Sequence, residues 1–161
     1  MSAEAGRFSG SSSASVDGKG RIVLPADFRR VLEARGCNYF HATPDLQHPE
    51  FLECFGPDHA RVIEMQLDEF DPYDEDGRIL RELLIGRMKQ LPFDVDGRFV
   101  LPAAFREKTG IDADAFFIGL GPTFHIRSKA AGEARSRELE ERGSAAARRM
   151  ASIGRLRRQG T

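Results

Sequence analysis

The sequence predicts an α+β fold built from two similar units in tandem, with helices between them and a long C-terminal helix. Three observations predict it. A block that reads as strand, turn, strand and helix start occurs twice, 77 residues apart. Each block is followed by two further short segments with strand character. Polar segments with helical periodicity separate and follow the two units. Short-range strand pairing with helices interspersed is typical of the α+β class.

The repeated block begins at Asp17 and again at Asp94. Nine of the thirteen positions from Asp17 to Arg29 are identical to the positions 77 residues later. Each copy places an arginine four residues after the aspartate, at Arg21 and at Arg98. The repeat therefore preserves a specific pair of charged side chains as well as the turn and strand that carry them.

The first unit is predicted to span residues 15–70, after a flexible Ser/Gly-rich lead at residues 1–14 in which Phe8 is the candidate to dock on the fold. Turn-forming residues at 17–20 separate two short strands. Pro25 suits the first position of a helix, and the apolar residues behind it recur at helical spacing.

Two short strands near residues 38–42 and 51–55 and a helix near 57–70 complete the first unit. An acidic linker and a connecting helix follow at residues 71–91. The apolar stripe predicted for that helix consists of Leu80, Leu83, Leu84, Met88 and Leu91.

The second unit, residues 92–147, repeats this order. Pro102 begins its first helix, and a hairpin turns around Gly121. A polar helix over about residues 128–150 closes the unit, and residues 148–161 are predicted to form a basic, flexible tail.

Composition argues against a membrane protein and against a disulfide-stabilised one. The chain has 161 residues, of which 40% are hydrophobic, but no apolar run approaches the roughly 20 residues of a membrane span. The first residues lack the layout of a signal peptide. Cys37 and Cys54 are isolated, with no Cys-x-x-Cys spacing. These features predict a cytoplasmic protein.

Charge is unevenly distributed along the chain. The net charge is −1, which by itself disfavours a nucleic-acid partner. Residues 36–80, however, hold 2 basic and 11 acidic side chains, and residues 129–161 hold 9 basic and 4 acidic ones. Such a molecule can present a positive surface despite its nearly neutral total.

Folding explains the aspartate, glycine and proline of the repeated block, but not the two arginines. An exposed ion pair contributes little to stability, whereas a guanidinium suits phosphate oxygens and the guanine edge. Spacing alone leaves both a binding role and a turn-stabilising Asp–Arg pair open. Duplication favours binding, because two arginine-bearing loops on one face match successive DNA sites. Lys19 adds positive charge to the first loop, and Asp96 in the same place repels phosphate.

The segments "VDGKGRIVLPADFR" and "DVDGRFVLPAAFR" resemble the paired motifs of the MraZ family of bacterial transcriptional regulators. The resemblance implies AbrB-like swapped-hairpin β-barrel units and assembly into a homo-oligomeric ring. It also implies binding to double-stranded DNA at short tandem promoter repeats of the division and cell-wall gene cluster, usually as a repressor associated with the nucleoid. The DNA-contacting residues that it implies are Asp17, Lys19, Arg21, Asp94 and Arg98, with Arg29 and Arg106 as secondary candidates.

Other classes of function find less support in the residues. The acidic segment near Gly77 fails as a calcium loop, because Pro72 and Leu83 would stand at ligand positions. The four histidines show no metal-binding spacing, and no phosphate-binding loop or nucleophile motif is present. We therefore expect no cofactor and no catalysis. The alternatives that stay open are a protein-interaction scaffold with the same fold, a hydrolase or metal enzyme for which no residues can be named, and an antitoxin-type AbrB relative.

Overall fold

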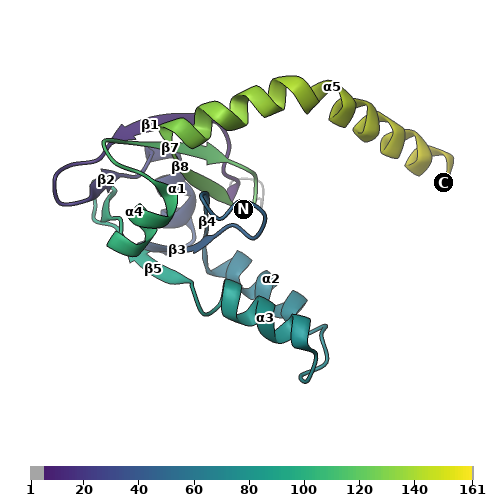
Figure 1. Cartoon of the computed structure of the whole chain (residues 1–161), viewed down its shortest axis with the longest axis horizontal. Helices are drawn as coiled ribbons and strands as arrows, with labels where there is room; N and C mark the ends of the chain where they lie inside the picture. Colours follow the sequence, from purple (N-terminus) through teal and green to yellow (C-terminus); the bar gives the residue numbers. More distant parts are fainter. Residues whose placement is uncertain (1–5, 161) are drawn as a thin grey trace. The chain divides into compact units, whose positions relative to one another are not determined.

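The computed structural model describes residues 6–160 and contains eight strands and five helices in that range (Figure 1). In chain order these elements are β1 (Ser11–Ser15), β2 (Arg21–Val23), α1 (Ala26–Ala34), β3 (Tyr39–Pro44), β4 (Leu52–Phe55), α2 (Pro57–Leu67), α3 (Glu75–Leu84), β5 (Lys89–Pro92), β6 (Arg98–Val100), α4 (Ala103–Thr109), β7 (Asp114–Gly119), β8 (Phe124–Ser128) and α5 (Lys129–Gln159). The α+β class is confirmed. The chain divides into two units between Lys129 and Ala130, so nearly all of α5 is a unit of its own.

The strands of the two repeats interlock. The six-stranded sheet has the order β1-β7-β8-β4-β3-β5, and β2 pairs with β6 in a separate two-stranded ribbon. If each strand is exchanged for its counterpart in the other repeat (β1 for β5, β2 for β6, β3 for β7, β4 for β8), the order of the sheet reads the same from its other end. Every strand of the first repeat also pairs with a strand of the second. The two repeats therefore form one pseudo-symmetric body and not two separate domains.

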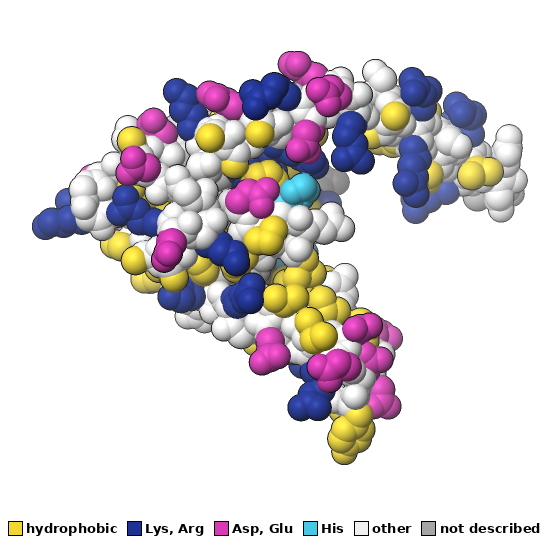
Figure 2. Space-filling view, in the orientation of Figure 1, with side chains coloured by type: hydrophobic (Ala, Val, Ile, Leu, Met, Phe, Trp, Pro, Cys, Tyr) yellow, Lys and Arg dark blue, Asp and Glu magenta, His cyan; other side chains and the backbone are white. Residues whose placement is uncertain are grey.

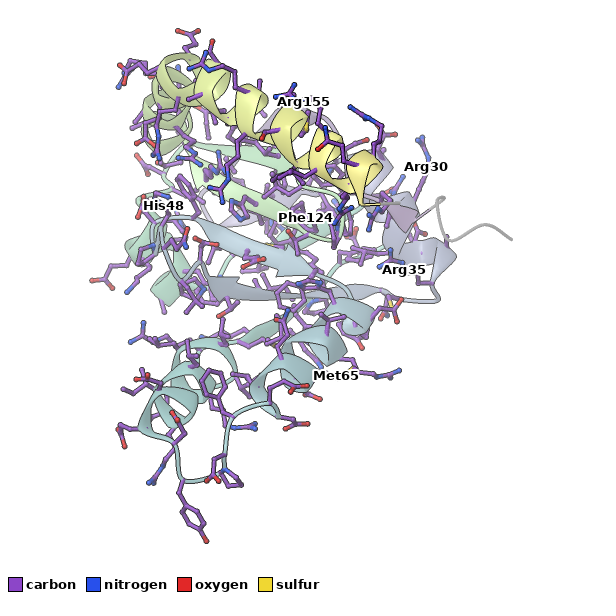
Figure 3. All side chains as sticks on the ribbon, turned by 90° about the vertical axis from the view of Figure 1, so that its right-hand side faces the viewer. Arg30, Arg35, His48, Met65, Phe124 and Arg155 are labelled. Atoms are coloured by element: carbon purple, nitrogen blue, oxygen red, sulfur yellow. The ribbon has the colours of Figure 1, made fainter. Side chains whose placement is uncertain are left out.

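One hydrophobic core lies between the sheet, the β2–β6 ribbon and the helices α1 and α4. Both repeats contribute to it, and Phe124 lies among its aromatic rings (Figure 3). The Phe124 ring centroid lies 4.8 Å from that of Phe8, 5.0 Å from that of Phe28 and 5.4 Å from that of Phe40. Phe8 is 1% exposed, so the docking predicted for this residue is confirmed. A core shared by both repeats means that neither half is sealed from water without the other.

Both ends of the described chain are more ordered than the sequence predicts. The flexible lead expected at residues 1–14 is wrong for residues 11–14, which together with Ser15 form β1 against the edge of β7. Their small polar side chains are mostly exposed, so the backbone ladder and not side-chain burial holds this edge strand. The expected flexible tail is also wrong, because α5 continues to Gln159. Residues 148–159 include five arginines and no proline, and arginine is a good helix former. Residues 1–5 lie outside the described part.

The connecting helix is shorter than predicted. It ends at Leu84, and Leu91 is not on its stripe but in β5, opposite Phe40. The chain turns tightly at Gly86, where a Cβ would lie 2.6 Å from the carbonyl oxygen of Glu82. A side chain does not fit there, and the helix stops. The α2–α3 hairpin closes over a small second core made of Phe55, Ile63 and Leu67, with Leu80, Leu84 and Met88 packed against it. No helix in residues 6–160 has the length and apolar character to cross a membrane.

Candidate functional site

The two repeated loops lie beside the β2–β6 ribbon, which is centred on the pair Ile22 and Phe99. In the same antiparallel register, Arg21 stands opposite Val100, and Val23 opposite Arg98. Ile22 and Phe99 are buried in the core, with 1% and 2% exposure. Because side chains alternate along a strand, the two arginines leave from the outer face of the ribbon. The pseudo-twofold relation thus places one arginine of each repeat on the same side.

The first loop is closed by Asp17 acting on its own backbone. Asp17 Oδ1 accepts hydrogen bonds from the N–H groups of Lys19 at 2.8 Å and Arg21 at 2.9 Å. Its other oxygen lies 2.6 Å from Arg21 Nε. The backbone bond from Arg21, followed by the bond from its guanidinium, lowers the pKa of Asp17 to about 2. The carboxylate therefore stays charged and orients the guanidinium through Nε, while the Arg21 side chain remains 51% exposed.

The second loop has the same geometry with a different charge. Asp94 Oδ1 accepts from the backbone N–H groups of Asp96 and Arg98, each at 2.9 Å, and Asp94 Oδ2 lies 2.9 Å from Arg98 Nε. Bonding to Asp94 raises the pKa of Arg98, and the backbone bond from Arg98 lowers the pKa of Asp94. Asp96 Oδ2 adds a further contact, 3.4 Å from Arg98 Nη2. The aspartate, the third residue and the arginine together carry a charge of +1 in the first loop and −1 in the second.

Arg29 and Arg106 lie beneath the loops and cross between the repeats. Arg29 Nη1 donates to the carbonyl oxygen of Val95, in the second loop, at 2.7 Å. Arg106 lies under Gly20 of the first loop, with Nη1 3.3 Å from the place a Cβ would take there. Each arginine thus supports the loop of the other repeat. The sequence could not indicate this, because the partner loop is more than 60 residues away.

Arg21 and Arg98 line one open depression together. Its remaining lining residues come from β5, β6 and the second loop: Pro92, Phe93, Asp94, Phe99 and Val100. In Figure 2, Lys and Arg side chains protrude at the end of the unit where Figure 1 labels β2. The fold therefore brings Asp94, Arg98 and Arg21 to one surface, while Lys19 is not among the residues that line it.

The structure also forms a cluster that sequence spacing did not reveal. Potential ligand atoms of Asp45, Glu53 and His125 lie within 4.8 Å of one another. Glu53 and His125 are a cross-strand pair of β4 and β8. Burial, with the charge of Asp45 next, raises the pKa of Glu53 to about 7. Arg127 Nη2 lies 2.9 Å from His125 Nδ1. Because arginine only donates, this nitrogen accepts, and the guanidinium opposes a cation in the cluster.

The chain is similar to several transcriptional regulators along most of its length. It is 38% identical over 127 residues to the transcriptional regulator MraZ of Parvibaculum lavamentivorans, covering 79% of each chain. With the MraZ regulator of Ruegeria pomeroyi it shares 35% identity, over 74% of this chain and 76% of that protein. With that of Rickettsia bellii it shares 32%, over 69% and 73%.

No family model matches the chain. The sequence identity to these relatives, and the share of each protein that the match covers, nevertheless assign the chain to their family. The chain belongs to the MraZ family of transcriptional regulators.

Proposed function

We propose that this protein is a sequence-specific DNA-binding regulator that represses the division and cell-wall gene cluster. In this proposal several copies, each made of interlocked swapped-hairpin units, form a ring on short tandem promoter repeats. The protein acts in the cytoplasm, at the nucleoid. Membership of a family of transcriptional regulators supports this proposal. The observation that carries it is the placement of Arg21 and Arg98 on the same outer face of the β2–β6 ribbon. As a member of a family of regulators, the protein is not an enzyme.

Arg21 supplies the specific part of the contact. Its Nε is engaged by Asp17, which fixes the plane of the guanidinium before DNA arrives. The terminal N–H groups of such a fork suit the O6 and N7 acceptors of guanine or two phosphate oxygens. A side chain that is already oriented loses less conformational freedom on binding. Asp17 therefore acts as a positioning residue for Arg21, and Asp94 does the same for Arg98.

Lys19 supplies a second, less specific part. An ammonium on a flexible stem neutralises phosphate without reading sequence, and the resulting release of counterions makes binding salt-dependent. Asp96 in the second loop has the opposite effect on phosphate and also contacts Arg98. We therefore assign the larger share of the affinity to the first loop.

A ring of copies provides the remaining affinity. Two arginine loops from a single chain make few contacts, and each of them is exposed to competing salt. When one copy is bound, its neighbours face the next promoter repeat at a high effective concentration. Tandem repeats spaced to match the ring are then bound far more tightly than one repeat alone.

The test is Arg21→Ala in a gel-shift titration with the DNA upstream of the chain's own gene. We expect repeat-specific binding to disappear while circular dichroism and the urea midpoint stay unchanged, because this side chain is half exposed and does not pack in the core. The residual binding should show a flatter dependence on salt, by about 0.9 in log–log slope for each phosphate that the variant no longer neutralises.

The matched control is Arg30→Ala, which removes an exposed arginine of α1 paired with Asp27 (Figure 3). It should leave the shift as it is in the wild type. If Arg21→Ala and Arg98→Ala both bind the repeats with wild-type affinity, the DNA-binding proposal is wrong, and a protein-interaction scaffold with this fold becomes the better description.

A further inference from the structure

The turn between α2 and α3 presents an aromatic side chain within a dense group of acids. We call residues 68–76 the acidic tip. Its six carboxylates belong to Asp68, Glu69, Asp71, Asp74, Glu75 and Asp76, and it contains no basic residue. Tyr73 lies at the centre of this group and is 89% exposed. Within residues 6–160, Asp68 alone among the six forms an ion pair, at 3.0 Å to Arg81. An exposed aromatic residue surrounded by unneutralised charge has the composition of a binding element.

The acidic tip is also held in one conformation. Asp71 Oδ1 accepts from the Tyr73 backbone N–H at 2.9 Å, and Asp74 Oδ1 accepts from that of Gly77 at 3.1 Å, which caps α3. Phe70 packs closely against the first turn of α3. A Cβ added at Gly77 would lie 2.7 Å from the Cβ of Phe70. A preformed segment loses little conformational entropy when it docks.

A complementary surface lies near the other end of the same hairpin, where α3 leads into β5. We call it the basic groove. Pro44, Ala104 and Phe105 line it, and three cationic residues complete the lining: Arg87, Lys89 and Lys108. Its volume is about 260 Å³. Lys89 Nζ lies 5.6 Å from the centre of the Phe105 ring. In the described part of the chain, none of the three cations forms an ion pair with a carboxylate.

We propose that the acidic tip of one copy docks in the basic groove of a second copy of this chain. Tyr73 lies over the apolar lining, in which Ala104 is exposed and Phe105 is only 4% exposed, and the carboxylates lie on Arg87, Lys89 and Lys108. Charge complementarity selects this occupant: an aromatic and acidic segment meets an apolar groove surrounded by cations. Cations next to the Tyr73 ring also gain a cation–π contact.

The contact is between molecules and runs from head to tail. α3 has 10 residues and therefore spans about 15 Å. Its first residues, Glu75 and Asp76, belong to the acidic tip, and its other end leads toward β5 (Figure 1), where Arg87 and Lys89 line the basic groove. A chain cannot fold this braced hairpin back on its own groove. An interface that joins different surfaces of identical copies is heterologous, and it generates a ring when the rotation closes. This inference rests on the oligomerisation in the proposed function but not on the DNA contacts.

Size-exclusion chromatography with light scattering tests the interface on the full chain. The tip variant is Tyr73→Ala with Glu75→Lys, and the groove variant is Lys89→Glu with Lys108→Glu. Removal of the Tyr73 anchor alone should weaken association roughly 30-fold. We expect the wild type to be a higher oligomer and each variant to be monomeric at the same concentration.

Mixing the two variants gives the decisive result. The tip variant retains an intact groove and the groove variant an intact tip, so one productive contact remains in a mixed pair. An equimolar mixture should therefore form a one-to-one dimer and nothing larger, although each variant alone is monomeric. An interface that pairs the same surface of both copies would not form such a dimer, and its absence would overturn the proposal.

Controls keep the two proposals separable. Met65→Ala removes an exposed side chain from α2 of the same hairpin (Figure 3), and Arg30→Glu reverses a charge on α1; both should assemble as the wild type does.

If the wild type assembles and the tip and groove variants assemble equally well, this interface is wrong and the DNA-binding proposal stands. If Arg148→Glu with Arg149→Glu disrupts assembly while the groove variant does not, α5 is the partner of the tip and the proposal is overturned. If the monomeric variants still bind the promoter repeats weakly and specifically, and Arg21→Ala loses repeat-specific binding, both proposals are supported.

Discussion

Replacing Glu53 by glutamine should stabilise the folded chain at neutral and higher pH, and leave its stability unchanged in acid. Glu53 shares the Asp45–His125 cluster, and its pKa is raised to about 7 because burial and the Asp45 carboxylate disfavour its charge. A protonated Glu53 donates to Asp45, and the amide of glutamine can donate in the same place without ever ionising.

The raised pKa of Glu53 determines the sign and the size of the change in the free energy of unfolding. Below pH 4.5 the carboxyl is protonated in both states. Between pH 4.5 and about 7 the unfolded chain releases the proton and the folded chain keeps it, so the wild type loses stability as the pH rises. The difference between 4.5 and about 7 corresponds to about 3 kcal/mol for a fully sheltered group. Glu53 is only half-buried, so solvent screens part of this, and we expect about 1–2 kcal/mol.

Urea unfolding of Glu53→Gln and the wild type at pH 4 and at pH 8 measures the effect. The difference in the free energy of unfolding should be near zero at pH 4 and about 1–2 kcal/mol in favour of the variant at pH 8. Glu107→Gln, on the exposed side of α4, is the matched control and should change neither value. A variant that is no more stable than the wild type at pH 8 would refute the reasoning about this cluster.

Two further predictions concern the loops and the core. Lys19→Asp should weaken DNA binding and flatten its salt dependence. Asp96→Lys should strengthen binding and steepen the slope of log affinity against log salt concentration by about 0.9 for each additional phosphate neutralised. Salt titrations of the gel shift measure both effects, and a change of the same sign in both variants would contradict the assigned asymmetry. Phe124→Ala should lower the free energy of unfolding by about 3–5 kcal/mol, because this ring packs against Phe8, Phe28 and Phe40. Urea denaturation tests it against half-exposed Phe116→Ala, and a decrease below about 1 kcal/mol would contradict the packing described.

Local structure was predictable from the sequence where turn chemistry and periodicity determine it. The repeated turns, the helix starts at Pro25 and Pro102 and the hairpin at Gly121 depend on residues close together in the chain. The strand pairing was not predictable from the residues. The alternation of apolar residues indicates which face of each strand is buried. The duplication itself is equally compatible with two separate units and with the interlocked sheet.

The sequence does not predict the features that depend on long-range contacts or on backbone hydrogen bonds alone. β1 has the sequence Ser-Ser-Ser-Ala-Ser, which carries no strand signal, and it forms because β7 offers an unpaired edge. Asp45 directly follows β3, Glu53 lies in β4 and His125 in β8, so the fold brings together three segments far apart in the chain. The family resemblance implies Arg29 as a secondary DNA contact, but its hydrogen bond to Val95 depends on how the two repeats cross.

The β2–β6 ribbon, centred on the pair Ile22 and Phe99, joins one strand from each repeat of the same chain. This affects how the proposed regulator can recognise a promoter. A protein that obtains its two loops from two identical subunits must treat both directions along a duplex alike, and it favours inverted sites. Here both loops lie in one chain, and they differ at Lys19 and Asp96. Such a protein has a front and a back along the DNA axis. In the proposed ring, successive copies then point the same way, which suits operator elements that repeat in the same orientation.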